Sequence, residues 1–175
     1  MQRISKENYY LNIAQTVLER ATCLRRVYGA IIVKNDEIIS TGYNGAPRGR
    51  RNCVDMGYCT RERLQVPRGE RYELCRSVHA EANAIISAAR RDMIGGTLYL
   101  VGRDAASGEL LHDTTSCAMC RRMIINSGIT RVVNRIGDDG IEIIDVRRTG
   151  SSTTSPASRR PRPNERGFAL QARRF

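Results

Sequence analysis

The sequence has 175 residues, of which 41% are hydrophobic, and its formal net charge is +11. This length is enough for one domain with a hydrophobic core, and no run of 18 apolar residues is present, so we expect no membrane-spanning helix. The N-terminal residues lack the apolar core of a signal peptide. We therefore expect a cytoplasmic protein whose six cysteines are thiols or metal ligands.

The positive charge is concentrated near the C-terminus. Residues 147–175 contain eight Arg and one Glu, a charge of +7, which leaves +4 for residues 1–146. We predict one domain over residues 1–146 and a basic tail over residues 147–175 that does not fold alone. The tail is either a solvated extension or a loose contact for a polyanion. A nucleic acid partner is not favoured, because residues 1–146 are only mildly basic and the tail offers only Phe168 and Phe175 for base stacking.

Hydrophobic periodicity and turn residues predict alternating helices and strands. The predicted helices span residues 5–21, 79–92 and 117–126, and the predicted strands span residues 28–34, 37–43, 97–101, 129–135 and 141–146. Asn35 and Asp36 favour a hairpin between the first two strands, whereas residues 44–77 and 102–115 are predicted to be irregular. Strands that alternate with helices indicate an α/β fold, here a three-layer α/β/α sandwich with a mixed five-stranded sheet.

Two short motifs at the starts of predicted helices carry side chains that bind metals. His79-Ala80-Glu81 offers an imidazole, and Cys117-Ala118-Met119-Cys120 offers two thiolates, which are ligands that zinc prefers. Three protein ligands leave one position open for water, whereas a structural zinc site is closed by four. In the alternative interpretation, a further cysteine closes the site and Glu81 is a surface residue.

This pair of motifs is similar to the signature of zinc-dependent base deaminases, H-x-E followed by P-C-x-x-C. In that class the metal activates a water, and a glutamate that is not a ligand moves protons. Ser116 stands where the signature has proline. Proline preorganises a helix start and serine can cap one with its hydroxyl, so we expect Ser116 to cap the helix and keep the cysteines in place.

Other polar residues have two interpretations each. Asn44 follows the end of a predicted strand and is either a turn residue that tolerates a positive φ or a substrate contact. Four further cysteines border or lie within the irregular segment, namely Cys23, Cys53, Cys59 and Cys75. They are either buried thiols or the ligands of a second, structural zinc that anchors the segment.

The sequence resembles the deoxycytidylate (dCMP) deaminase family, within the cytidine-deaminase-like superfamily, over about residues 5–146. Besides the zinc motifs, the matching segments are residues 23–26, 29–33, 39–49, 52–53, 82–85, 98–100 and 124–129. The resemblance implies hydrolysis of dCMP to dUMP and ammonia, with Glu81 as the proton shuttle. It also implies that His79, Cys117 and Cys120 bind the catalytic zinc.

The resemblance further implies substrate contacts at Asn44, with Ala80 and Ser116 at the pocket wall. It implies a nucleotide-effector site that uses Mg²⁺ and is bordered by the loop from Asn44 to Gly49, which includes Gly45. The effectors would be dCTP and dTTP, and the chain would form a homohexamer.

Two features remain open after this comparison. Some family members bind a second zinc through cysteines that match Cys23 and Cys53. Arg25, Arg26 and Arg48 are candidates for binding a phosphate or an effector, because a guanidinium matches a phosphate in geometry. Two rival functions remain as well: deamination of another cytosine or modified-pyrimidine nucleoside or nucleotide, and nucleotide sensing by a zinc protein without catalysis.

Overall fold

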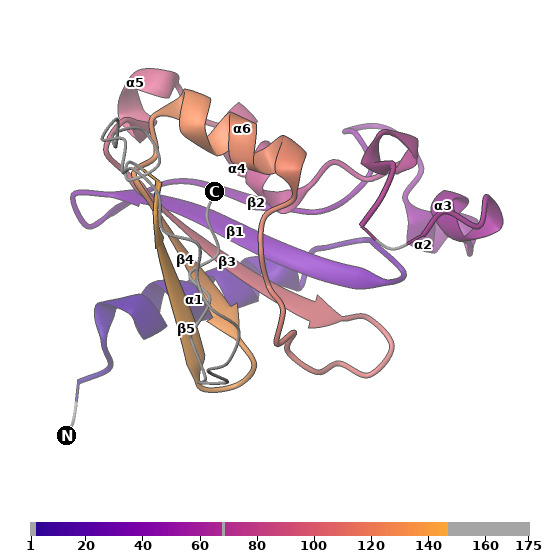
Figure 1. The fold of residues 1–175 in the computed structure, drawn as a ribbon, viewed down its shortest axis with the longest axis horizontal. Helices are drawn as coiled ribbons and strands as arrows, with labels where there is room; N and C mark the ends of the chain where they lie inside the picture. The colour runs from indigo at the N-terminus through magenta and orange to yellow at the C-terminus, as the bar shows by residue number, and fades with distance from the viewer. Residues whose placement is uncertain (1–2, 68, 147–175) are drawn as a thin grey trace, which may run out of the picture.

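A mixed β-sheet forms the centre of the molecule. The structure, a computed structural model, describes residues 3–67 and 69–146. Within these residues, five strands lie in the order β2-β1-β3-β4-β5 (Figure 1). β3 and β4 pair in parallel, while the other neighbours are antiparallel. The strands are β1 (Arg26–Lys34), β2 (Glu37–Tyr43), β3 (Thr97–Asp104), β4 (Arg131–Ile136) and β5 (Gly140–Asp145).

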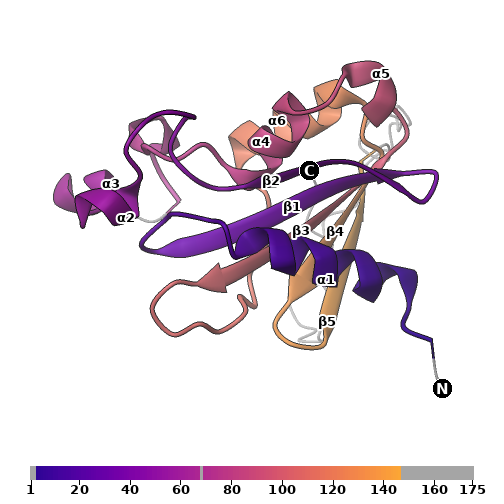
Figure 2. The ribbon, with the colours of Figure 1, turned by 180° about the vertical axis from the view of Figure 1, so that it is seen from behind.

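Helices cover both faces of the sheet, which confirms the three-layer α/β/α sandwich. α1 (Lys6–Leu18) crosses one face, where it lies in front of the sheet in Figure 2. α4 (Ala80–Ile86), α5 (Arg90–Met93) and α6 (Ala118–Ser127) lie on the other face (Figure 1). Alternating side chains of β1 enter two buried clusters: Ile31 packs with α1, and Ile32 packs on the face of α4 and α6.

Two glycines in the strands allow the helices to approach the sheet closely. A Cβ atom on Gly29 would lie 2.1 Å from the carbonyl oxygen of Ala14 in α1. A Cβ atom on Gly42 would lie 2.3 Å from the carbonyl oxygen of Ala80 in α4. The backbones of α1 and α4 therefore rest almost directly on β1 and β2.

The hairpin between β1 and β2 is confirmed, but two other elements differ from the sequence prediction. Asn35 and Asp36 have φ angles of 53° and 63°, the conformation that the tight turn requires. The predicted helix over residues 79–92 is divided into α4 and α5. The break occurs because Ser87 ends α4 and its hydroxyl donates to the Asn83 carbonyl at 2.7 Å, which competes with helix continuation.

The second difference lies at the end of β3, which continues to Asp104 instead of ending at residue 101. The extension exists because residues 26–29 of β1 pair with residues 101–104, a long-range contact that local periodicity does not encode. The predicted loop therefore begins only after β3.

The irregular segment between β2 and α4 contains three short helical turns. These are α2 (Cys53–Met56), α3 (Thr60–Arg63) and the 3₁₀ turn η1 (Tyr72–Leu74). Gly45 and Val78 close the base of the segment through two backbone hydrogen bonds of 3.2 and 2.8 Å. The segment is therefore anchored directly before His79.

Two predictions concern the limits of the domain. The predicted tail over residues 147–175 lies outside the described residues, so the boundary at residue 146 stays a prediction. Among the helices of residues 3–67 and 69–146, none is long and apolar enough to cross a membrane.

Candidate active site

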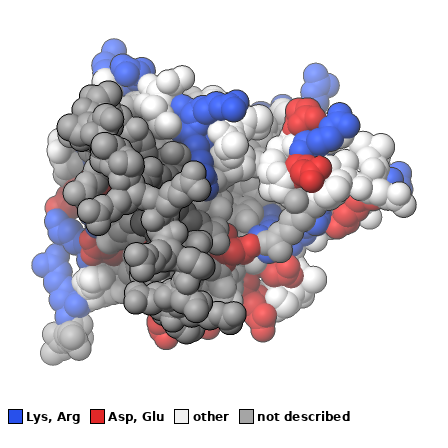
Figure 3. Space-filling model, in the orientation of Figure 1, with Lys and Arg blue, Asp and Glu red and all other residues white. Residues whose placement is uncertain are grey.

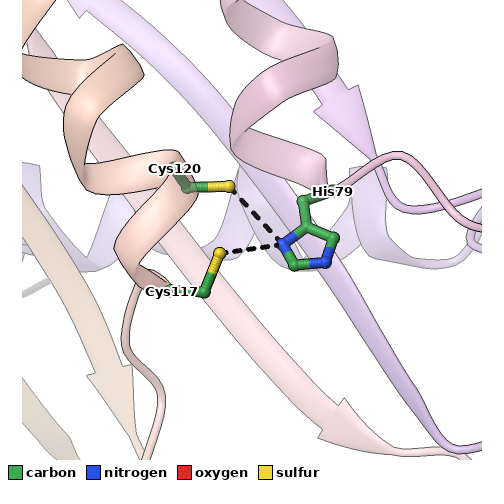
Figure 4. A group of neighbouring side chains, drawn as sticks. All are labelled: His79, Cys117 and Cys120. Atoms are coloured by element: carbon green, nitrogen blue, oxygen red, sulfur yellow. Dashed lines mark hydrogen bonds between the residues drawn. The ribbon is translucent and has the colours of Figure 1, made fainter. Parts of the chain in front are cut away.

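Three metal-binding side chains meet where α4 and α6 begin. His79 is the N-cap of α4 and Cys117 is the N-cap of α6, while Cys120 lies in the first turn of α6. The Nδ1 atom of His79 lies 3.4 Å from the Sγ atom of Cys117 and 3.5 Å from that of Cys120 (Figure 4). Both predicted helix starts therefore bring their ligands to one point.

The geometry of this group fits zinc. All three ligand atoms lie within 4.8 Å of one another. A tetrahedral zinc ion with usual Zn–S and Zn–N bond lengths places a sulfur and a nitrogen ligand about 3.6 Å apart. The observed separations of 3.4 and 3.5 Å are close to that value. The donor set is one imidazole and two thiols, which leaves the fourth position of a tetrahedron without a ligand from this group.

The pKa values of the two thiols shift in opposite directions. A hydrogen bond from the Cys120 thiol lowers the pKa of the Cys117 thiol to about 4, and the His79 imidazole acts in the same direction. The same hydrogen bond raises the pKa of the Cys120 thiol, and burial adds to that rise. One thiolate is thus available near neutral pH, and a bound cation would favour the second.

Glu81 lies beside the ligand group without belonging to it. Its side chain sits in the first turn of α4 and is almost fully buried, with 4% of its surface exposed. Burial raises the pKa of the Glu81 carboxyl group, and the neighbouring His79 partly opposes this shift. A buried carboxyl group with a raised pKa can both accept and donate a proton near neutral pH.

A pocket of about 130 Å³ opens in front of these residues. His79, Ala80, Glu81 and Cys117 line its inner end, and Asn44 lines its wall. The Asn44 side chain accepts a hydrogen bond from the Tyr28 backbone at 2.7 Å and donates one to the Arg26 carbonyl at 2.9 Å. Its φ is not positive, so it does not adopt the left-handed conformation that asparagine tolerates in turns.

Ser116 is buried but does not cap α6 as predicted. Cys117 occupies the N-cap position, and the Ser116 hydroxyl has no hydrogen-bond partner of good geometry among the described residues. Arg121 holds this turn instead: its Nε atom donates to the Ser116 carbonyl at 2.9 Å and its Nη2 atom to the Thr115 hydroxyl at 3.3 Å. Ser116 lines the wider surface cleft beside the pocket.

The candidate phosphate or effector residues fall into two groups. Arg25 and Arg26 line the pocket, and each is paired with a carboxylate, Arg25 with Glu62 at 2.9 Å and Arg26 with Asp113 at 3.2 Å. Gly45 and Arg48 do not line it, and Arg48 is exposed to solvent.

The four remaining cysteines are free thiols in one neighbourhood. Cys23, Cys59 and Cys75 line the pocket wall, and Cys53 is buried. Burial raises the pKa of the Cys53 thiol, and the other three cysteines add to that rise, which places all four close together. Among the described residues they do not form a ligand group as compact as the one at His79.

Two residues of the pocket wall were not predicted from the sequence. The Tyr72 ring packs edge-on against the His79 imidazole with 5.1 Å between the ring centres. Arg61 is buried in the same wall. No periodicity or motif marks these residues, and the only signal was the unusual length of the irregular segment.

Comparison with known proteins identifies the family. The profile of the cytidine and deoxycytidylate deaminase zinc-binding region matches residues 4–135. The chain belongs to this deaminase family. It is 38% identical over 139 residues to the deoxycytidylate deaminase of Mycobacterium phage D29, in an alignment that covers 76% of this chain and 96% of the phage protein.

Two further comparisons place the deaminase among relatives of different length. It is 34% identical over 131 residues to the deoxycytidylate deaminase of Schizosaccharomyces pombe, covering 75% of this chain but only 37% of the yeast protein. The crystal structure of dCMP deaminase from the cyanophage S-TIM5 in apo form superposes with a TM-score of 0.53 at 24% identity, covering 79% of this chain and 88% of that one. The latter similarity shows a shared fold.

Proposed function

We propose that this deaminase hydrolyses dCMP to dUMP and ammonia. The observation that carries the proposal is the three-ligand group of His79, Cys117 and Cys120 with a buried, non-ligand Glu81 beside it. His79, Cys117 and Glu81 line one pocket. The substrate is inferred from relatives that are themselves named deoxycytidylate deaminases.

The residues divide the chemistry between them. When bound, zinc would supply a Lewis acid that makes a water molecule nucleophilic near neutral pH. The Glu81 carboxylate accepts one proton from the attacking water and delivers it to N3 of the base. It then accepts the second proton from the hydroxyl group on C4, as the carbonyl forms, and delivers it to the departing amine, which leaves as ammonia. The water oxygen bonds to C4, the bond from C4 to the amine breaks, and cytosine becomes uracil. Burial of Glu81 favours its protonated form, which suits the step in which it acts as an acid.

The pocket wall holds the rest of the nucleotide in this proposal. The Asn44 side chain makes two hydrogen bonds to the β1 backbone, and its remaining hydrogen-bonding positions contact the deoxyribose. Ala80 lines the inner end next to Glu81, and Ser116 borders the outer cleft. Arg25 and Arg26 are near enough to interact with an anionic substrate, although each shares its charge with a carboxylate.

We also propose how the enzyme assembles and is regulated. It forms a homohexamer in the cytoplasm, and dCTP and dTTP regulate it through a Mg²⁺-dependent effector site beside Gly45 and Arg48. It also includes a second, structural zinc held by cysteines of the irregular segment. The proximity of Cys23, Cys53, Cys59 and Cys75 favours this zinc, because four thiolates can complete a tetrahedral zinc site.

The decisive experiment compares substrates. The purified protein is mixed separately with dCMP, cytidine, dCTP and cytosine, and the ultraviolet change on deamination is followed with and without effectors. Turnover confined to dCMP supports the proposal. Turnover of another compound would establish a deaminase with a different substrate, and inactivity on all four with zinc bound would favour a nucleotide sensor without catalysis. Elemental analysis counts the zinc, and two ions per chain would support the second site.

A further inference from the structure

Arg61 in α3 is a buried cation in the pocket wall. Only 6% of its surface is exposed. Its Nη2 atom donates hydrogen bonds to the carbonyl oxygens of Pro67 at 2.8 Å and Glu70 at 2.6 Å, and its guanidinium lies 4.6 Å from the centre of the Tyr72 ring. Its Nε atom is buried and has no hydrogen-bond partner among the described residues. One donor of this guanidinium is therefore left unused inside the protein.

Arg61 forms no ion pair in residues 3–67 and 69–146. The nearby Glu73 lines the neighbouring cleft and pairs with Arg71 at 3.0 Å, and the charges of Arg71 and Arg61 both lower the pKa of its carboxyl group. The two other arginines of the pocket do have carboxylate partners. On the surface over α2 and α3, acidic and basic side chains lie next to each other (Figure 3). A buried charge without a partner is costly, and such residues commonly await a ligand of opposite sign.

The position of Arg61 relative to the ligand group suggests which anion it binds. The Tyr72 ring lies between Arg61 and the His79 imidazole, in contact with both. Arg61 and Glu81 line the same pocket. A base that reaches Glu81 would thus direct the far end of its nucleotide along the wall that holds Arg61.

We propose that Arg61 binds the 5′-phosphate of the substrate and gives the enzyme its preference for the nucleotide over the nucleoside. The unused Nε donor and the positive charge are what a phosphate oxygen requires, and the two carbonyl contacts hold the guanidinium plane in place before the substrate arrives. This inference rests on the proposed dCMP deamination, because it assigns a role within the same pocket.

The test compares a nucleotide with its nucleoside in matched variants. Arg61→Gln removes the charge, Arg61→Lys keeps it, and Arg63→Gln is the control because Arg63 lies on the same short helix, is exposed and stacks on Tyr58 outside the pocket. Values of kcat/KM are measured for dCMP and for deoxycytidine. Zinc content and thermal unfolding establish that each variant is folded.

We expect Arg61→Gln to lower kcat/KM for dCMP by about 10- to 100-fold, the range for losing a hydrogen bond to a charged group, and to leave the value for deoxycytidine unchanged. Arg61→Lys should fall between, and Arg63→Gln should match the original protein. An equal loss for both substrates would mean that Arg61 only holds the backbone at Pro67 and Glu70, and no loss for dCMP would exclude the phosphate contact. Either result overturns the inference.

A binding measurement separates this inference from the proposed function. If the unaltered protein deaminates none of the substrates, the proposed function is wrong, but calorimetry can still compare the affinities for dUMP and deoxyuridine. A preference for dUMP that Arg61→Gln abolishes would support the phosphate contact on its own. Equal affinities in the unaltered protein would overturn it.

Discussion

The close contact between Gly42 and α4 gives a sharp test of how the site is positioned. In Gly42→Ala the new methyl carbon would lie 2.3 Å from the Ala80 carbonyl oxygen and from the Ala84 nitrogen. Ordinary contacts begin near 3.4 Å, so α4 must move by more than 1 Å or β2 must yield. Overpacking of this kind costs roughly 1–3 kcal/mol of stability. Because α4 carries Glu81 and begins at His79, such a shift should also lower kcat by roughly 100-fold.

Gly29→Ala is the matched control. Its methyl carbon would lie 2.1 Å from the Ala14 carbonyl oxygen and 2.6 Å from the Leu18 nitrogen, so it displaces α1 on the opposite face, where no residue of the site lies. Both variants should shift the urea midpoint by about 1 M. In the absence of urea, only Gly42→Ala should lose dCMP turnover and bind zinc less tightly. If both variants lose turnover equally, or if Gly42→Ala keeps its turnover, the geometry of the site does not depend on how closely α4 packs on β2.

Three further changes test single contacts. Glu81→Gln should retain zinc by elemental analysis and lose roughly 10²- to 10⁴-fold in kcat, and an active variant would contradict the proton-transfer role. Arg121→Ala frees the turn before α6 and should weaken zinc binding in a chelator competition by roughly 10- to 100-fold, whereas exposed Arg122→Ala should not. A hydrogen bond from Arg103 lowers the pKa of Glu19 in the folded protein. The pair therefore stabilises the fold fully above the pKa of Glu19 in the unfolded chain, about 4.3. This stabilisation is lost as the pH falls through the lower pKa of Glu19 in the folded protein. Glu19→Gln should therefore lower the free energy of unfolding at neutral pH, measured by urea denaturation, by less than about 1 kcal/mol because Glu19 is 54% exposed. In acid the substitution should leave this free energy unchanged.

The parts of the fold that the sequence predicted are those with local causes. Alternating apolar residues placed each strand, and the positive φ angles at Asn35 and Asp36 follow from side chains that tolerate them. The break after α4 was missed because alanine-rich composition favours a continuous helix, while the Ser87 hydroxyl acts against it through one contact. The ligand group could be predicted because its three members lie at the starts of two predicted helices, which bring them together.

The pocket wall, unlike the ligand group, could not be predicted from short sequence motifs. The ligand atoms come from helix ends that the packed sheet holds in place, so short motifs are enough to find them. Part of the wall comes from the segment between β2 and α4, and other parts come from β1, the residues before it and the residues before α6. In that segment Arg61 is held by backbone carbonyls, and the Gly45 and Val78 hydrogen bonds fix only the base. Nothing in local sequence encodes such contacts. In the proposed function, the chemistry depends on the helix starts, whereas the choice of substrate depends on a segment whose shape follows from tertiary contacts and from the proposed second zinc. Changes in substrate preference should map to this segment and leave zinc binding at His79 intact.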